Sequence, residues 1–217
     1  AISIGGLVEI IPTMLVESNV KEISSVKPYT PLELEGRDLY IKEGCYNCHS
    51  QMVRPLRFET ARYGEYSKSG EFVYDHPFQW GSKRTGPDLA REGGLRSNSW
   101  HYEHMIRPKD ISTGSIMPAY PWLRDNELDV DLIEKKIRAM QKLGVPYPEG
   151  FDEIARDSLK SQAHRIAEDI IMNRNPELLK GVNIQAKIEE LRNKEIIALI
   201  AYLQRLGVDI SMKNEKN

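Results

Sequence analysis

The sequence predicts a mostly α-helical protein with a single main domain. Several stretches carry apolar residues at helical spacing, and no stretch has the alternation of a convincing strand. Between residues 45 and 120 the chain is instead rich in glycine and proline, which interrupt any long periodicity. With 217 residues and 40% hydrophobic content, the chain can bury a core of its own. We therefore expect helices packed around an irregular central segment.

The N-terminus has the character of a membrane anchor. Residues 1–16 are almost entirely apolar, but a full membrane span needs about 20 such residues. Because the chain starts at Ala1 and is hydrophobic from there, we expect residues 1–16 to be the C-terminal part of a transmembrane anchor helix that continues upstream. Glu9 and Pro12 fit the end of such a span. A buried N-terminal strand or helix is the alternative.

The remaining chain divides at changes in composition. Residues 17–30 are polar and predict a linker, residues 31–210 the main domain, and residues 211–217 a tail. Thr30, Pro31 and Glu33 form a helix-start signal, so a helix should run from about 31 to 43 and end at Gly44. Further helices are expected over 98–106, 132–143, 151–170 and 184–206. Residues 125–185 are expected to form a helical insertion.

Charge and cysteine content narrow the function. Lys and Arg total 30 against 32 Asp and Glu, so the net charge of -2 gives no reason to expect a nucleic-acid partner. The two cysteines, Cys45 and Cys48, are too few and too close together for a disulfide framework. Their role must be local chemistry.

Cys45-Tyr46-Asn47-Cys48-His49 is the pattern of covalent haem attachment. The two thiols are spaced to add to the two vinyl groups of one porphyrin, and His49 can then ligate the iron. A zinc half-site would need further ligands, and a thioredoxin-like redox pair would follow a strand. Because the motif follows a predicted helix and no second cysteine pair exists, we interpret it as the site of one covalent haem c.

The motif and the order of the elements around it resemble the class I cytochrome c family, and this resemblance implies a methionine as the sixth iron ligand. Met117, in Ser115-Ile116-Met117-Pro118, is our candidate among the seven methionines, with His101, His104 and Met105 as rivals. A thioether ligand raises the reduction potential of a haem, which suits a carrier that feeds a strong oxidant.

The order of these features resembles the class I cytochrome c family. Gly36 and Tyr40 in the first helix, with Leu199 and Tyr202 in the last, look like the residues through which those helices cross in that family. The segment 85–89 resembles the family's loop on the histidine side, which includes Leu89. The resemblance implies that the Pro87 carbonyl accepts a hydrogen bond from the His49 ring.

The anionic propionates of a haem require donors elsewhere in the chain. From the sequence we select Arg54, Trp80 and Arg84 for this role. His76, beside Pro77, is expected to be structural and to have no redox role.

Residues 3–12, 44–55 and 74–89 more closely resemble the mono-haem cytochrome c subunit of cbb3-type haem-copper oxidases. This resemblance covers residues 3 to about 124 and resumes in the last helix. It implies a bacterial cytoplasmic-membrane protein with a periplasmic haem domain. Electrons would come from a di-haem cytochrome c subunit or a soluble cytochrome c and pass to the catalytic haem-copper subunit. The family also has a calcium ion near a subunit junction, whose ligands this sequence does not identify.

On this interpretation the chain has no catalytic residues of its own. The alternative is a freestanding, membrane-tethered cytochrome c that shuttles electrons. A peroxidase would need an open sixth position or a second haem, and a single attachment motif argues against it. The span lacks its first half, and residues 125–185 match the family less clearly.

Overall fold

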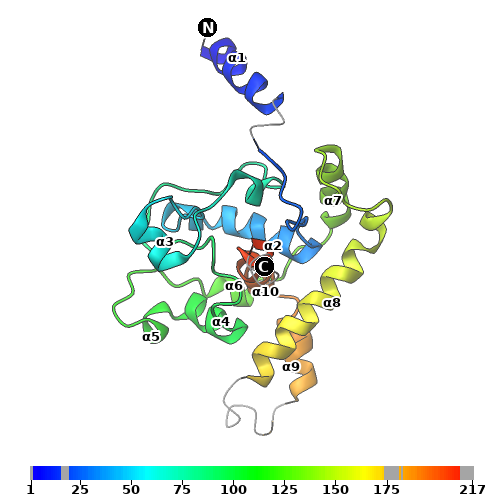
Figure 1. Cartoon of the computed structure of the whole chain (residues 1–217). Coiled ribbons are helices and arrows are strands. Elements are labelled where there is room, and N and C mark those ends of the chain that lie inside the picture. Colours follow the sequence, from blue (N-terminus) through cyan, green and yellow to red (C-terminus); the bar gives the residue numbers. More distant parts are fainter. Residues whose placement is uncertain (1, 16–19, 174–180, 182, 211–217) are drawn as a thin grey trace.

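The structure is a computed structural model that describes residues 2–15, 20–173, 181 and 183–210 (Figure 1). These residues form helices and connecting loops. Across the described ranges no strand occurs, and an isolated antiparallel bridge joins Glu127 to Lys194. The mostly α-helical prediction is confirmed for this part of the chain.

The helices follow one another with short turns between several of them. Their bounds are α1 (Ile2–Leu15), α2 (Pro31–Lys42), α3 (Arg57–Tyr63), α4 (Asn98–Ile106), α5 (Pro108–Ile111), α6 (Trp122–Asp125), α7 (Ile133–Lys142), α8 (Phe151–Met172), α9 (Ile184–Leu191) and α10 (Glu195–Arg205). Two 3-10 turns, η2 (Cys45–Asn47) and η3 (Ser69–Phe72), lie in the irregular region.

Helix α2 begins at the predicted capping signal. The Glu33 amide donates to the Thr30 hydroxyl at 3.3 Å, and the Thr30 amide donates to the Glu33 carboxylate at 2.8 Å. This reciprocal pair satisfies two amides that have no partner within the helix. Gly44, with a φ of 71°, follows the end of the helix in a conformation that favours glycine.

Helices α2 and α10 cross in direct backbone contact. A Cβ atom at Gly36 would overlap the carbonyl oxygen of Ala198, so only glycine allows this approach. Beside the contact, the rings of Tyr40 and Tyr202 pack with centroids 5.3 Å apart at 57°. Both tyrosines are buried. The glycine and aromatic pairs picked out in the sequence therefore do meet in the crossing.

The prediction of one helix from 184 to 206 is wrong. The chain breaks between α9 and α10 because the segment after α6 takes over its backbone groups. The Leu128 amide donates to the Asn193 carbonyl at 2.7 Å, and the Glu195 amide donates to the Asn126 carbonyl at 3.1 Å. No glycine or proline marks this break, which is why periodicity alone did not reveal it.

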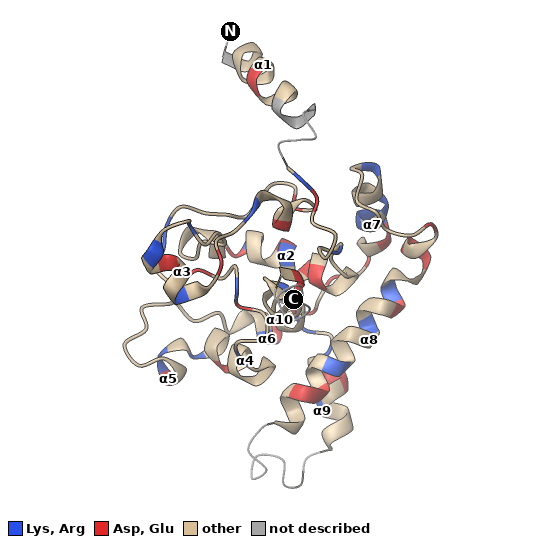
Figure 2. Cartoon of the chain, viewed as in Figure 1, with Lys and Arg blue, Asp and Glu red and all other residues tan. Residues whose placement is uncertain are grey.

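Residues 125–185 place α7 and α8 beside the crossing. Helix α8 contacts α2, α4, α7, α9 and α10, and its buried side chains join the same hydrophobic core as the crossing helices. Charged residues of both signs are interspersed along its outer surface (Figure 2). Residues 174–180 and 182 of this segment lie outside the described residues.

Helix α1 stands apart from the other helices (Figure 1) and exposes its apolar side chains. Ile4 and Val8 are each 67% exposed. Among the described residues, none of the helices has the length and apolar character needed to cross a membrane. The expected transmembrane anchor is therefore not confirmed. Residues 17–19 of the expected linker and the expected tail at 211–217 lie outside the described residues.

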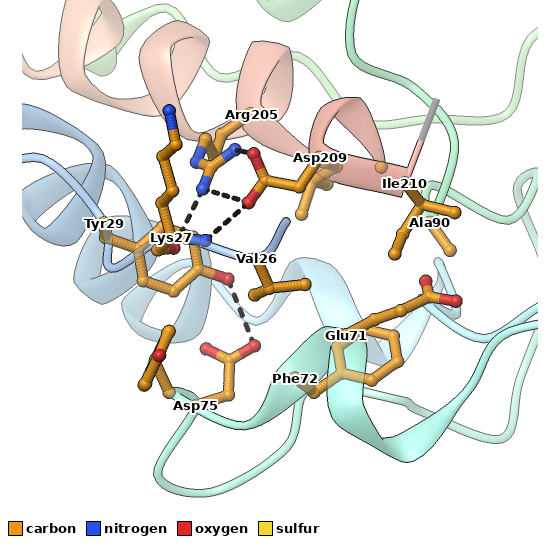
Figure 3. A pocket seen from close by; sticks show the side chains of 13 residues that line it. Val26, Lys27, Tyr29, Glu71, Phe72, Asp75, Ala90, Arg205, Asp209 and Ile210 are labelled. Carbon is orange, nitrogen blue, oxygen red and sulfur yellow. Dashed lines mark hydrogen bonds and ion pairs between the residues drawn. The ribbon is translucent and has the colours of Figure 1, made fainter. Parts of the chain in front are cut away.

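The chain leading into α2 is fixed to the C-terminal end of the fold (Figure 3). The Lys27 amide donates to the Asp209 carboxylate at 2.8 Å, and Arg205 donates to the Lys27 carbonyl at 2.8 Å. The Tyr29 hydroxyl donates to Asp75 at 3.1 Å. These residues line a cavity of about 40 Å³ in which Arg205 pairs with Asp209, while the lining carboxylates of Asp75 and Glu71 pair with Arg37 and Arg91 outside it.

Replacement of Gly36 by alanine tests the helix crossing. Because the new Cβ would push α2 away from α10, we expect Gly36→Ala to lower the free energy of unfolding by about 1–3 kcal/mol, as overpacking does. Urea unfolding of the two proteins measures the difference. Gly6→Ala in α1 is the control, since a Cβ there meets no neighbouring atom. An equal effect of the two variants would contradict the crossing contact.

Candidate functional site

A cavity of about 400 Å³ lies between η2, α4, α10 and the loops at 85–89 and 112–120. This volume is within the range of roughly 300–1,000 Å³ that is usual for cofactor sites. Cys45, Cys48, His49, Pro87 and Met117 all line it, and so does Leu89. The structure thus brings six of the nine residues selected from the sequence to one cavity.

The two cysteines lie on the turn that follows α2. The Cys48 and His49 amides donate to the Cys45 carbonyl at 3.1 and 3.0 Å, which closes the turn. Both thiols are free. Burial, with a smaller contribution from Glu43, raises the pKa of Cys45 to about 12. A dithiol redox centre needs the opposite, a lowered thiol pKa, so this environment disfavours the thioredoxin-like alternative.

A zinc site receives no support either. In the described part of the chain, no group of three or more His, Cys, Asp or Glu side chains is arranged to hold a metal ion. A structural zinc site needs four such ligands. The cysteine pair and His49 therefore stand without further zinc ligands among these residues.

The imidazole of His49 is held on two sides. Its Nδ1 lies 2.8 Å from the Pro87 carbonyl oxygen, the contact that the family resemblance implied. A Cβ at Gly86 would lie only 2.7 Å from Nδ1 and 2.8 Å from Nε2, so the ring packs flat against glycine backbone. With Nδ1–H donating to Pro87, Nε2 is the nitrogen that remains available as an electron-pair donor.

Tyrosines of the helix crossing fix the chain just after the cysteine motif. The Tyr40 hydroxyl donates to the His49 carbonyl at 3.3 Å, and the Tyr202 hydroxyl donates to the Gln51 side-chain oxygen at 3.0 Å. The backbone amide of Gln51 in turn donates to the backbone carbonyl of Trp80 at 2.7 Å. The α2–α10 contact is therefore connected directly to the position of His49.

Helix α4 and the 112–120 loop form the wall that carries the candidate sixth ligands. Met117 and its rivals His101, His104 and Met105 all line the cavity. Met117 packs against the hydrophobic core, and its amide donates to the Ser115 hydroxyl at 3.2 Å. The choice of Met117 as ligand remains a prediction.

Two histidines on this wall have buried nitrogens without hydrogen-bond partners among the described residues. They are Nε2 of His101 and Nδ1 of His104. Burial, and then the nearby Arg96 and His104, lower the pKa of His101 to about 4. His101 is therefore a neutral imidazole at neutral pH. His104 stacks on Trp100 with ring centroids 4.4 Å apart.

The three residues selected for the haem propionates do not line the cavity. Arg84 donates to the Ser50 hydroxyl at 2.6 Å, the Met52 carbonyl at 2.8 Å and the Glu59 carboxylate at 2.7 Å. Arg54 lies 3.6 Å from Glu59. Trp80 packs with Phe72 and Phe78. In the structure these three side chains therefore belong to contacts outside the cavity lining, and their role toward a haem stays a prediction.

Sequence reasoning missed one cavity residue that carries positive charge, Arg96. Its Nη1 donates to both oxygens of Glu92, at 2.8 and 2.9 Å, and its guanidinium lies 4.4 Å from the centre of the Trp100 ring. The sequence did offer a signal for Arg96, namely its position directly before Ser97. Ser97 is the N-cap of α4, and its hydroxyl accepts a hydrogen bond from the backbone amide of Trp100.

Comparison with known families gives the affiliation. The model of the family described as cytochrome c oxidase, mono-heme subunit/FixO, matches residues 1–210. The chain belongs to the FixO family. This agrees with the resemblance seen in the sequence. FixO membership makes the chain a mono-haem cytochrome c oxidase subunit, which implies one haem and a catalytic subunit as partner. No curated protein matches the chain.

The cavity of this FixO chain fits a haem. Two free thiols and the His49 imidazole open on it, and the glycine backbone at Gly86 leaves room for the ring. The buried, unpartnered Nε2 of His101 also needs a polar partner from within the cavity. Apolar walls with a few polar atoms are what an amphiphilic porphyrin requires.

The hydrogen bonds that Arg84 donates to Ser50, Met52 and Glu59 predict that the stability of the fold depends on pH. Hydrogen bonds from Arg84, opposed by burial, hold the pKa of Glu59 below its ordinary value. The ionised carboxylate therefore stabilises the fold above the unfolded pKa of about 4.3, and this contribution is lost as the pH falls through the lower folded pKa. As the pH falls from about 5 through the folded pKa of Glu59, we expect Glu59→Gln to lose less stability than the unchanged protein. Urea unfolding at each pH measures this.

Glu153→Gln on α8 is the control, because the Glu153 side chain is exposed and makes no hydrogen bond to any described residue. This variant should follow the unchanged protein at every pH. Identical curves for Glu59→Gln and Glu153→Gln would rule out the contribution of the Glu59 carboxylate.

Proposed function

We propose that this chain is the electron-transfer subunit of a cbb3-type haem-copper oxidase and carries one covalent haem c. The observation that supports this most directly is the cavity itself, on which Cys45, Cys48 and His49 open together. FixO membership supplies the oxidase context. The bound haem would store and release one electron at a time.

The residues of the chain have distinct roles in this proposal. The Cys45 and Cys48 thiols form thioether bonds with the two vinyl groups, which prevents loss of the haem. His49 ligates the iron through Nε2 while its Nδ1–H donates to Pro87, and this bond fixes the ring and strengthens its donor nitrogen. Met117 would provide the sixth ligand of the iron. Leu89 would pack on the side of the haem that His49 ligates.

Electrons enter from a di-haem cytochrome c subunit or a soluble cytochrome c and leave to the catalytic haem-copper subunit. Exposed apolar side chains next to the cavity support a docking face, since Tyr46 is 38% and Ile116 is 76% exposed. Tyr46 follows the cavity residue Cys45 in the sequence, and Ile116 itself lines the cavity beside Met117.

The proposal places the protein at the bacterial cytoplasmic membrane, with the haem domain on the periplasmic side. The exposed apolar surface of α1 supports membrane association. Covalent haem attachment to thiols takes place on the extracytoplasmic side, which supports this orientation. A calcium ion at a subunit junction stays part of the family expectation, and its ligands are not assigned.

Mass spectrometry and a pyridine haemochrome spectrum test haem attachment. Protein isolated from a host that attaches c-type haem should carry the mass of one haem and show one c-type haem per chain. In Cys45→Ala and Cys48→Ala, one thioether is lost, so the spectrum should shift toward that of a singly attached haem. A polypeptide of unmodified mass would end the proposal.

Substitution at position 117 tests the sixth ligand. We expect Met117→Ala to abolish the long-wavelength charge-transfer band of a methionine–ferric haem and to lower the reduction potential, because the thioether is lost. Met105→Ala, which removes the rival methionine of the same wall, is the matched control and should retain the band. If instead Met105→Ala loses the band, the ligand is Met105.

Purification from the native membrane separates the oxidase subunit from a freestanding shuttle. An affinity tag on this chain should recover a stable complex that contains a haem-copper catalytic subunit with b-type haem. Recovery of the chain as a single haem protein under the same mild detergent conditions would favour the shuttle. The Cys48→Ala variant serves as the control for dependence on correct haem attachment.

A further inference from the structure

The cavity has a polar corner at the start of α4. Arg96 lies just before α4, and Glu92 lies four residues before Arg96 in the preceding loop. His101 is the fourth residue of α4. All three line the cavity. Glu92 and Arg96 are the charged side chains among the lining residues that the structure describes, so this corner holds the charges of the wall.

His101 lacks a partner in this corner. Its side chain is 2% exposed, and its Nε2 makes no hydrogen bond to any described residue. The nearest acidic atom, Oε1 of Glu92, lies 3.6 Å away, too far for a hydrogen bond. A buried polar atom left unsatisfied is destabilising, so a partner is expected from inside the cavity.

Arg96 is also positioned for a second anion. Glu92 occupies only its Nη1, which leaves Nε and Nη2 without hydrogen bonds to the described residues. Stacking on Trp100 holds the guanidinium in place. A guanidinium can bind a second carboxylate through the remaining edge of its planar fork. Glu92 thus orients Arg96 and compensates part of its charge.

This corner lies at the far end of α4 from the cysteines. At its C-terminal end, the Met105 carbonyl accepts a hydrogen bond from the Tyr120 amide at 2.8 Å. Tyr120 is close enough to Cys45 and Cys48 that, after burial, their charges raise its pKa. From Arg96 to Met105 the chain rises about 13 Å at 1.5 Å per residue. One end of the cavity therefore carries the thiols, and the other end carries a guanidinium and an imidazole.

A porphyrin of the haem type has the same two-ended chemistry. Its vinyl groups are on one side of the ring, and its two carboxylate side chains are on the opposite side. We propose that Arg96 and His101 bind a haem propionate carboxylate, with Glu92 as the positioning residue of Arg96. This inference rests on the proposed function, because it needs the vinyl side to be attached at Cys45 and Cys48.

The competing residues lie outside the cavity lining, Trp80 included, although the Nε1 of Trp80 is buried without a hydrogen-bond partner among the described residues. Arg84 is bound to Ser50, Met52 and Glu59, and neither Arg84 nor Arg54 lines the cavity. To reach a propionate, Arg84 would have to leave Glu59, a carboxylate that is 1% exposed. Glu59 would then keep only the more distant guanidinium of Arg54, at 3.6 Å, as an opposite charge, which is unfavourable for a buried carboxylate.

Resonance Raman spectroscopy of the haem-loaded protein tests the assignment, because the propionate bending modes report hydrogen bonds to the carboxylate. Arg96→Gln and His101→Leu should both shift these modes and leave the axial-ligand marker bands in place. Arg96→Gln should also lower the reduction potential, since a removed positive charge favours the ferric state. Arg96→Lys should retain the charge and restore part of the potential.

Arg54→Gln is the matched control, a partly exposed arginine outside the cavity, and should leave the propionate modes unchanged. Modes that shift in Arg54→Gln but not in Arg96→Gln would overturn the assignment, as would unshifted modes in both cavity variants. If His101→Leu fails to fold, Arg96→Gln decides, since Arg96 is partly exposed. A pyridine haemochrome spectrum of each protein distinguishes the failure of this proposal from the failure of the proposed function. Absence of c-type haem from the unchanged protein would contradict the proposed function, whereas unshifted propionate modes in haem-loaded variants would contradict the propionate contact.

Discussion

The close contact between α2 and α10 determines where the histidine of the site lies. Gly36 removes the side chain that would keep the helices apart, and the paired rings of Tyr40 and Tyr202 fill the space beside it. The hydroxyls of the same rings bind the backbone of His49 and the side chain of Gln51. Packing and site geometry therefore depend on the same residues, and neither can change alone.

Much of this arrangement could be predicted because its signals are local. The capping residues at Thr30 and Glu33 and the helix at 98–106 need only a few neighbours in sequence, and the structure has both as expected. The cysteine motif and the Pro87 loop were recognised from residue spacing and family resemblance. Their meeting around one cavity agrees with that interpretation.

Features that depend on distant parts of the chain were not predictable. The break before α10 exists because residues 126–128 bind its backbone groups, an interaction that helical periodicity does not contain. The arginines show the same limit. Arg84 and Arg96 both carry the required charge, and only tertiary structure reveals that Arg84 is enclosed with Glu59 while Arg96 faces the cavity.

The contacts of Lys27 with Arg205 and Asp209 limit how far the domain can travel from α1. Upstream of Lys27, Lys21 and Ile23 also lie directly against Gly70, so the body holds the chain from residue 21 onward and five residues, 16–20, separate it from α1. A fully extended segment of this length reaches at most about 20 Å. If α1 rests on a surface, the domain samples a shallow layer above it, and encounters with neighbours embedded there occur at high local concentration.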